Sequence, residues 1–210
     1  MLITFEGIDG SGKSTQIAML AQWLGGRGAT VLTLREPGGT TFSEAVRSVL
    51  LSTKHEIHPR AELLLFEAAR AQLVETVIRP ALGRNIIVIC DRFADSSTAY
   101  QGYGRGLSVS DVENCNFMAT GGLKPDITFF LDIPIETAFE RAAGRNGSTA
   151  DRMEQSGRDF FERVREGYTL IATTEKERFR IIRADSTPQK VHEAVCSEIS
   201  ELIAQYTAKA

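Results

Sequence analysis

The sequence predicts an α/β fold in which a five-stranded parallel sheet is flanked by helices. Short apolar, β-branched runs recur along the chain, and amphipathic segments lie between them. This alternation is typical of a parallel sheet covered on both faces, because the connections between parallel strands place helices there. In addition, the first run leads directly into a glycine-rich loop and then into a helical pattern.

The elements are expected in a regular order along the chain. Five apolar runs are predicted to be strands: residues 2–7, 30–36, 85–93, 126–134 and 179–185. A helix should follow the first strand, where apolar residues keep a spacing of three and four over 17–24. Further helices are expected over residues 61–78, over 108–119 and, closing the chain, over 188–206.

Composition narrows the class of protein. The chain has 210 residues, of which 42% are hydrophobic and 24% charged, and its formal net charge is −3. The chain has no basic stripe of the kind that would indicate nucleic acid as a partner. The LITF run is too short for a signal peptide, and no apolar stretch approaches the roughly 18 residues of a membrane span. Cys90, Cys115 and Cys196 lack metal-ligand spacing, so we interpret them as buried free thiols. We expect one cytoplasmic domain over residues 1–210.

Residues 7–14, GIDGSGKS, match the phosphate-binding loop G-x-x-x-x-G-K-[ST]. Its glycines let backbone N–H groups point at phosphates, and the following helix start adds partial positive charge. Lys13 should reach the β- and γ-phosphates, and the Ser14 hydroxyl should ligate Mg²⁺. The residues expected to bind ATP in this loop are Gly7, Ile8, Asp9, Gly10, Ser11, Gly12, Lys13, Ser14 and Thr15.

Among phosphate-loop proteins, a small-molecule kinase is favoured. The chain has no N-K-x-D, no D-x-x-G beyond the phosphate loop and no LSGGQ, which argues against switch GTPases and transporter ATPases. A kinase needs a second site for the phosphate acceptor. Asp91 and Arg92 close the third expected strand, where α/β sheets bind ligands: the carboxylate could hold Mg²⁺ and the guanidinium a phosphate. A surface ion pair is the alternative.

The helix over 61–78 carries Phe66 and Arg70 on one apolar stripe. Phe66 alone would suit a core, but an unpaired inward charge is costly. A helix that borders a pocket would explain both, with a ring to stack on a base and donors for its edge. Two further loops can each be interpreted in a structural or in a functional way. REPGG, residues 35–39, is a plain turn or passes close to the acceptor; residues 141–152 are a solvated loop or a basic lid.

Taken together, these motifs resemble the thymidylate kinase family. The resemblance rests on the phosphate loop with Asp9, REPGG, Phe66 with Arg70, the Asp91–Arg92 pair and SSTAYQGYGRG at 96–106. It implies a three-layer P-loop kinase fold with a lid over about 141–154, and transfer of the γ-phosphate of ATP to dTMP with Mg²⁺. It also implies a homodimer.

The resemblance further implies roles for single residues. Asp9 would accept a hydrogen bond from the 3′-hydroxyl of the acceptor's deoxyribose and help to orient Arg92, which contacts the phosphates. Phe66 would stack on thymine while Arg70 donates to its O4. The dTMP site would comprise Asp9, Glu36, Pro37, Phe66, Arg70, Arg92, Ser96, Ser97, Tyr100 and Gln101. The metal would be held by Ser14 and Asp91.

Lid arginines complete the implied site. Some family members carry an arginine just after the loop aspartate, where this chain has Gly10, so cations from the lid should replace it. Arg145 and Arg152, the latter in DRME, would stabilise transition-state charge, and Arg141 would pack on adenine. Lys13, Arg92, Arg145, Arg152 and Asp9 form the expected catalytic set; no general base is needed, since the acceptor phosphate is already anionic.

Two other functions stay open from the residues. A deoxynucleoside kinase has a similar fold and could use Asp91 as a base on the 5′-hydroxyl. A non-catalytic P-loop ATP-binding regulator would keep the loop without turnover. Asp9 and Arg92 argue against the first, and the complete acceptor pocket argues against the second.

Overall fold

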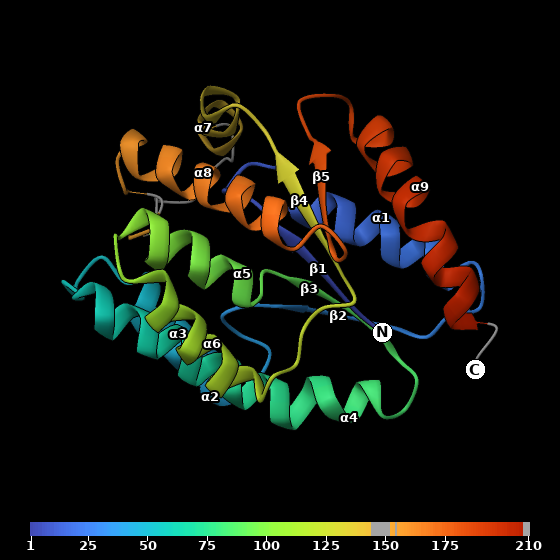
Figure 1. Ribbon diagram of the computed structural model, residues 1–210, viewed down its shortest axis with the longest axis horizontal. Coiled ribbons are helices and arrows are strands. Elements are labelled where there is room, and N and C mark those ends of the chain that lie inside the picture. Colours follow the sequence, from blue (N-terminus) through green and yellow to red (C-terminus); the bar gives the residue numbers. More distant parts are fainter. Residues whose placement is uncertain (144–151, 154, 208–210) are drawn as a thin grey trace.

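The fold is described from a computed structural model of the protein, over residues 1–143, 152–153 and 155–207. Five parallel strands form one sheet in the order β2-β3-β1-β4-β5 (Figure 1). The strands are β1 (Leu2–Glu6), β2 (Val31–Arg35), β3 (Ile87–Asp91), β4 (Ile127–Asp132) and β5 (Phe179–Arg183). Each lies inside one of the predicted runs, which confirms the α/β fold.

Helices cover both faces of this sheet. The α-helices are α1 (Lys13–Gly25), α2 (Thr41–Leu51), α3 (Pro59–Leu73), α4 (Arg79–Leu82), α5 (Ala94–Ser97), α6 (Val109–Thr120), α7 (Ile135–Ala143), α8 (Arg158–Thr174) and α9 (Pro188–Thr207). Two π-helical segments, η1 (Val74–Ile78) and η2 (Thr98–Gly104), continue α3 and α5. The expected helix over 61–78 therefore belongs to a longer helical stretch, α3–η1–α4.

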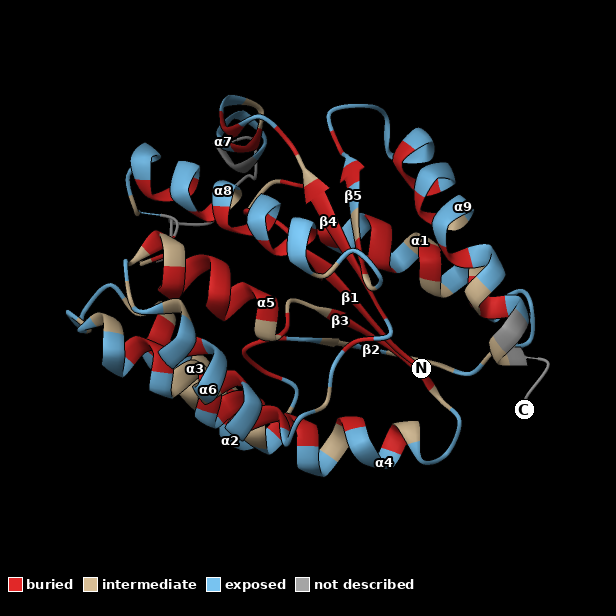
Figure 2. Ribbon diagram, viewed as in Figure 1, coloured by how far each residue is buried: buried red, intermediate tan, exposed pale blue. Residues whose placement is uncertain are grey.

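The central strands β1, β3 and β4 are buried because apolar side chains on both faces of the sheet pack against helices. Ile3 and Ile89 belong to a cluster that includes Leu20 and Leu24 of α1. The alternate residues Leu2 and Val88 pack instead with side chains of α3, η1 and α4. This period of two is the reason for near-continuous apolar strands. Figure 2 shows the result: β1, β3 and β4 are buried, the outer strands β2 and β5 are partly exposed, and the buried stripes of the helices face inward.

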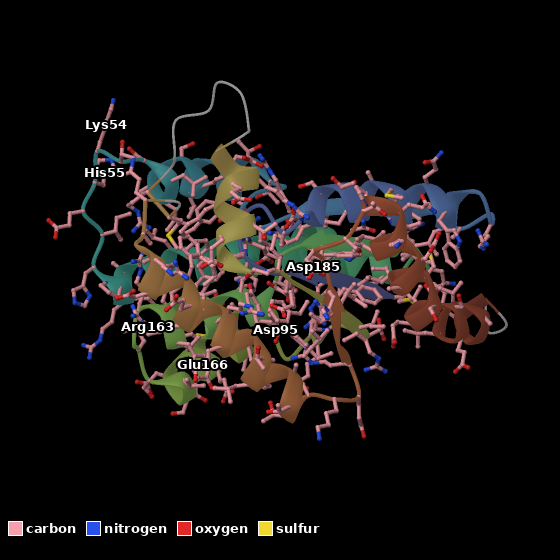
Figure 3. All side chains as sticks on the ribbon, turned by 90° about the horizontal axis from the view of Figure 1, so that it is seen from above. Lys54, His55, Asp95, Arg163, Glu166 and Asp185 are labelled. Carbon is pink, nitrogen blue, oxygen red and sulfur yellow. The ribbon has the colours of Figure 1, made fainter. Side chains whose placement is uncertain are left out.

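Charged side chains lie mainly at the periphery. Lys54 and His55 project from the loop between α2 and α3, whereas Asp95 lies inside (Figure 3). Within the described ranges, no helix combines the length and apolar character that crossing a bilayer requires. All three cysteines are free; Cys90 is buried as predicted, whereas Cys115 and Cys196 are only partly buried.

Candidate functional site

The phosphate loop connects β1 to α1 and lines a cavity of about 620 Å³, here called the large cavity. Asp9, Gly10, Ser11, Gly12, Lys13, Ser14 and Thr15 all line it. Gly12 has φ +94° and caps α1, so the loop's N–H groups converge at the helix start. Lys13 Nζ donates to the carbonyl oxygens of Gly7 and Ile8, both at 3.1 Å. Burial, and then the nearby charge of Arg92, lowers the pKa of Lys13.

The backbone around Gly10 explains why this loop has no arginine after Asp9. Its φ is +82°, and a Cβ built there would lie 2.4 Å from the carbonyl oxygen of Ala138 in α7. Both the backbone angle and this carbonyl exclude a side chain. Extra positive charge at the large cavity must therefore come from another segment.

Ser14 and Asp91 meet across the large cavity. Ser14 Oγ donates to Asp91 Oδ2 at 3.3 Å, which brings together the two predicted metal ligands from α1 and the end of β3. Hard oxygen donors of this kind suit Mg²⁺, which also takes ligands from water and substrate phosphates. Among the residues that the structure describes, no group of three His, Cys, Asp or Glu side chains could hold a metal. A metal at Ser14 and Asp91 therefore needs nucleotide oxygens as well.

Arg92 lies between the phosphate loop and the acceptor side. Its Nη2 donates to Asp9 Oδ1 at 2.9 Å, and its Nη1 donates to Gly7 O at 2.9 Å. The guanidinium also lies 4.9 Å from the ring centroid of Tyr100. Arg92 has φ +70°, an uncommon angle for a residue with a side chain, and such strain is concentrated at functional sites. Asp9 thus faces Arg92, as the resemblance implies.

A second, narrower cavity adjoins the first. All eight dTMP-site residues predicted beyond Asp9 and Arg92 line it: Glu36, Pro37, Phe66, Arg70, Ser96, Ser97, Tyr100 and Gln101. Asp9, Glu36, Arg47 and Arg92 line both cavities. The two cavities therefore meet at a boundary that carries two arginines and two carboxylates.

Arg70 is 2% exposed, and the structure pairs its charge in a way the sequence did not reveal. Its Nε donates to Glu36 Oε2 at 2.8 Å, and its Nη1 donates to Glu67 Oε1 at 2.5 Å. Nη1 also donates to Ser97 Oγ and Asn116 Oδ1, both at 3.0 Å. The helix does border a pocket, as expected, but two buried carboxylates offset most of the cost of the inward charge.

Glu36 contributes the wall of the narrow cavity next to Arg70. It is 6% exposed, and its Oε1 has no hydrogen-bond partner among the described residues. Burial raises the pKa of Glu36 to about 7, although the Arg70 charge opposes this shift. Its carboxyl group can therefore change protonation state near neutral pH.

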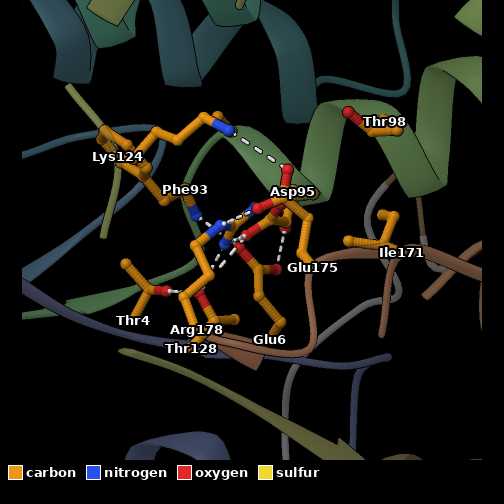
Figure 4. A network of polar contacts seen from close by, with 12 residues as sticks. Thr4, Glu6, Phe93, Asp95, Thr98, Lys124, Thr128, Ile171, Glu175 and Arg178 are labelled. Atoms are coloured by element: carbon orange, nitrogen blue, oxygen red, sulfur yellow. Dashed lines mark hydrogen bonds and ion pairs between the residues drawn. The ribbon is translucent and has the colours of Figure 1, made fainter. Parts of the chain in front are cut away.

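A second network of buried polar contacts lies next to α5 (Figure 4). Glu6, at the end of β1, accepts hydrogen bonds from the Phe93 N–H at 2.7 Å and from Tyr168 Oη at 2.7 Å. In the same cluster, Arg178 forms two 2.8 Å hydrogen bonds with Asp95 of α5. Burial, and then the Asp95 charge, raises the pKa of Glu6 to about 7.

This raised pKa predicts a pH-dependent stability. The folded state holds the Glu6 proton more tightly than the unfolded state, so stability is fully present below about pH 4.5 and is lost as the pH rises through about 7. Glu6→Gln should remove this dependence. Between pH 5 and pH 8, we expect the wild type to lose on the order of 3 kcal/mol more unfolding free energy than the variant. Urea unfolding at both pH values measures it, and equal losses would contradict it.

The lid arginines lie in different places. Arg141, in α7, lines the large cavity and donates to Ala184 O at 3.1 Å. Arg145 is outside the described residues. Arg152 does not line the large cavity, and its Nη1 lies 2.6 Å from Glu62 Oε2. Its role in stabilising transition-state charge stays a prediction, and that role would require this buried ion pair to break.

Sequence reasoning missed Arg47, Glu62, Glu67 and Asn116. Arg47, in α2, donates to Pro37 O at 3.0 Å and lines both cavities. No motif surrounds it, so only the fold reveals its place. Glu67 had a detectable signal, because it precedes Arg70 by three residues on the same helix.

Comparisons with known proteins agree with this geometry. The family model described as thymidylate kinase matches residues 5–195. A thymidylate kinase of Chlorobium luteolum is 50% identical over 208 residues, covering 96% of this chain and 97% of that protein. One of Chlorobium chlorochromatii is 48% identical over 208 residues, covering 95% and 94%. The crystal structure of thymidylate kinase from Ehrlichia chaffeensis is 36% identical with a TM-score of 0.77, covering 95% of this chain and 98% of that one.

A phosphate loop beside an acceptor cavity, and relatives of this identity over nearly the whole length, lead to one assignment. The chain belongs to the thymidylate kinase family.

Proposed function

We propose that the protein transfers the γ-phosphate of ATP to dTMP, giving dTDP and ADP. The observation that carries this proposal is the boundary shared by the two cavities, lined by Asp9, Glu36, Arg47 and Arg92. A donor phosphate in the large cavity and an acceptor phosphate from the narrow cavity would meet there. Positioning of the two groups supplies much of the acceleration in such reactions.

On the donor side, the loop from Gly7 to Thr15 holds the ATP phosphates, and Lys13 moves from its loop carbonyls to the β- and γ-phosphates. Arg141 packs beside adenine, which its place in the wall of the large cavity supports. Ser14 and Asp91 hold Mg²⁺. The ion, when bound, neutralises phosphate charge and orients the transferred group.

On the acceptor side, Arg92 grips the phosphates in the transfer path, held in place by Asp9. Asp9 also accepts a hydrogen bond from the 3′-hydroxyl of the deoxyribose. Arg47 is a second cation for the acceptor phosphate, an assignment supported by its place in both cavity walls. No general base is required, because the acceptor phosphate is an anionic nucleophile near neutral pH.

In the narrow cavity, Phe66 stacks on the base, and Arg70 presents donors to its O4. Ser97 and Gln101 complete the base edge, while Tyr100 packs beside the deoxyribose and disfavours a 2′-hydroxyl. The position of all five residues in one cavity wall supports these roles.

This pocket predicts a ranking of acceptors in a steady-state assay of ADP release. Uracil lacks only a methyl group, so kcat/KM for dUMP should be about 10- to 200-fold below that for dTMP. Cytosine sets an amino group against a guanidinium that can only donate, so dCMP should fall by about 10⁴-fold or more. The ribose form of TMP should also be poor. Comparable rates with dCMP and dTMP would contradict the role of Arg70.

We also propose a homodimer formed through α2, α3 and α6. Within the described ranges, these three helices carry most of the large apolar side chains that are strongly exposed: Phe42, Val49, Leu64, Phe117 and Met118. The helices pack side by side (Figure 1). Exposed apolar side chains gathered on adjacent helices are typical of an interface. Sedimentation equilibrium should give twice the chain mass of 23.1 kDa; a monomer at micromolar concentration would contradict it.

The remaining assignments are broader. We propose that residues 1–210 act as one nucleoside monophosphate kinase domain, because both cavities lie along one sheet edge. The free cysteines and the nature of the substrates support a cytoplasmic location. ATP and dTMP are then the principal partners.

A further inference from the structure

Glu62, in the first turn of α3, is a fully buried carboxylate with three partners from two parts of the chain. Its Oε1 accepts hydrogen bonds from Gln101 Nε2 at 2.9 Å and from Arg105 Nε at 3.1 Å. Its Oε2 accepts from Arg105 Nη2 at 3.3 Å and lies 2.6 Å from Arg152 Nη1. Gln101 lines the narrow cavity, and Glu62 does not. Glu62 can therefore influence a ligand only through other residues.

The two guanidinium groups keep this carboxylate ionised. Burial acts to raise the pKa of Glu62, but the hydrogen bonds from Arg105, Gln101 and Arg152 and the positive charge of Arg105 lower it overall. An ionised carboxylate is an acceptor only. The group that Gln101 turns toward Glu62 must therefore be its amide NH₂, which settles an orientation that heavy-atom positions alone leave ambiguous.

With its NH₂ committed to Glu62, the amide oxygen of Gln101 is the atom that can accept a hydrogen bond from a ligand in the narrow cavity. Thymine and uracil carry a hydrogen on N3, whereas neutral cytosine carries a lone pair there. We propose that Glu62 is a positioning residue for base selection: it fixes the Gln101 amide so that its oxygen accepts the N3–H of thymine. This inference rests on the proposed dTMP kinase function.

Arg70 supplies the hydrogen-bond donor that complements the acceptor on Gln101. Its guanidinium is held by Glu36, Glu67 and Asn116, so it too has one fixed orientation at the cavity wall. A fixed donor facing O4 and a fixed acceptor facing N3–H match thymine at two adjacent positions. Cytosine opposes both: its amino group faces the donor and its bare N3 faces the acceptor. Release of the Gln101 amide should remove one of these two mismatches.

Glu62→Gln tests the proposal, because the new side chain keeps the volume but can donate as well as accept. Gln101 could then rotate and present its NH₂ to N3 of cytosine. We expect the ratio of kcat/KM for dTMP to that for dCMP to fall by about 10-fold. The matched control is Asp95→Asn, which also removes a buried carboxylate bound to an arginine, but the hydrogen bonds of Asp95 go to Thr128 and Arg178 and not to Gln101. Its ratio should stay at the wild-type value.

A double-mutant cycle separates positioning from a merely structural role. In a Gln101→Ala background, Glu62→Gln should leave the dTMP-to-dCMP ratio unchanged, since the residue it positions is gone. The same change in both backgrounds, or no change in either, would overturn the proposal. If Glu62→Gln does not fold, as circular dichroism would reveal, Glu62→Asp replaces it: the charge stays but the carboxylate retreats from Gln101, and the same loss of ratio is expected.

Different results would refute the proposed dTMP kinase function and the proposed role of Glu62. A wild-type protein that does not phosphorylate dTMP would refute the proposed function itself. A wild type that phosphorylates dTMP with strong preference over dCMP, together with a Glu62→Gln variant of equal preference, would refute only the role of Glu62.

Discussion

Arg92→Ala is expected to lower kcat for dTMP by about 10³-fold or more, because arginines that stabilise the transferred phosphoryl group contribute about 10³ to 10⁵ in rate. Arg92 lies at the boundary of the two cavities, where negative charge would develop during transfer. Its left-handed backbone angle and its bonds to Asp9 and Gly7 O hold it there. Steady-state kinetics with saturating ATP and dTMP measure the effect.

Arg70→Ala serves as the matched comparison for Arg92→Ala. Both changes remove a guanidinium that is paired with a carboxylate, but Arg70 lines only the narrow cavity, whereas Arg92 lines both cavities. Arg92→Ala should therefore lose more activity, mainly in kcat, while Arg70→Ala should act mainly on the KM for dTMP. Equal losses in kcat/KM for the two variants would contradict the assignment of Arg92 to the transfer path.

Arg70→Ala should also destabilise the fold by about 3–5 kcal/mol, the usual cost of removing one partner from a buried ion pair. The change would leave Glu36 and Glu67 buried without their shared cation. The loss should shrink at low pH, because protonation removes the stranded charges. Without Arg70 the pKa of Glu36 in the folded state rises further above its pKa in the unfolded state. The free energy of unfolding of the variant is therefore retained at pH values below the unfolded-state pKa and falls as the pH increases.

Urea unfolding of Arg70→Ala at pH 5 and pH 8 measures this effect. A triple variant that adds Glu36→Gln and Glu67→Gln is the control, since it removes both stranded carboxylates. It should recover much of the lost stability at pH 8. An Arg70→Ala protein within 1 kcal/mol of the wild type, or a triple variant no more stable than Arg70→Ala, would show that the buried pairs are not the cause.

Local patterns were sufficient for the sheet and for the motif-bearing residues. Parallel strands buried on both faces have a continuous apolar sequence, so all five could be located, and the loop from Gly7 to Ser14 has a fixed spacing that local chemistry dictates. Phe66 and Arg70 were found because an inward charge on an apolar stripe breaks the pattern of an ordinary core helix.

Two of the residues that sequence reasoning missed, Glu62 and Asn116, act across long separations. Glu62 meets Gln101 and Arg152 at sequence separations of 39 and 90 residues, and Asn116 reaches Arg70 over 46. Nothing near these residues indicates their partners, because each looks like a solvated helical side chain. The prediction for Arg152 also rests on local information, its position in DRME, whereas its bond to Glu62 depends on the fold.

The most direct test follows the label from [γ-³²P]ATP when the protein and Mg²⁺ are incubated with either dTMP or thymidine, and products are separated by chromatography. Transfer to a nucleotide phosphate beside Arg92 predicts labelled dTDP from dTMP and no labelled dTMP from thymidine. Labelled dTMP from thymidine would identify a nucleoside kinase and overturn the role of Arg92. No labelled nucleotide from either acceptor would contradict catalysis itself and leave only an ATP-binding protein.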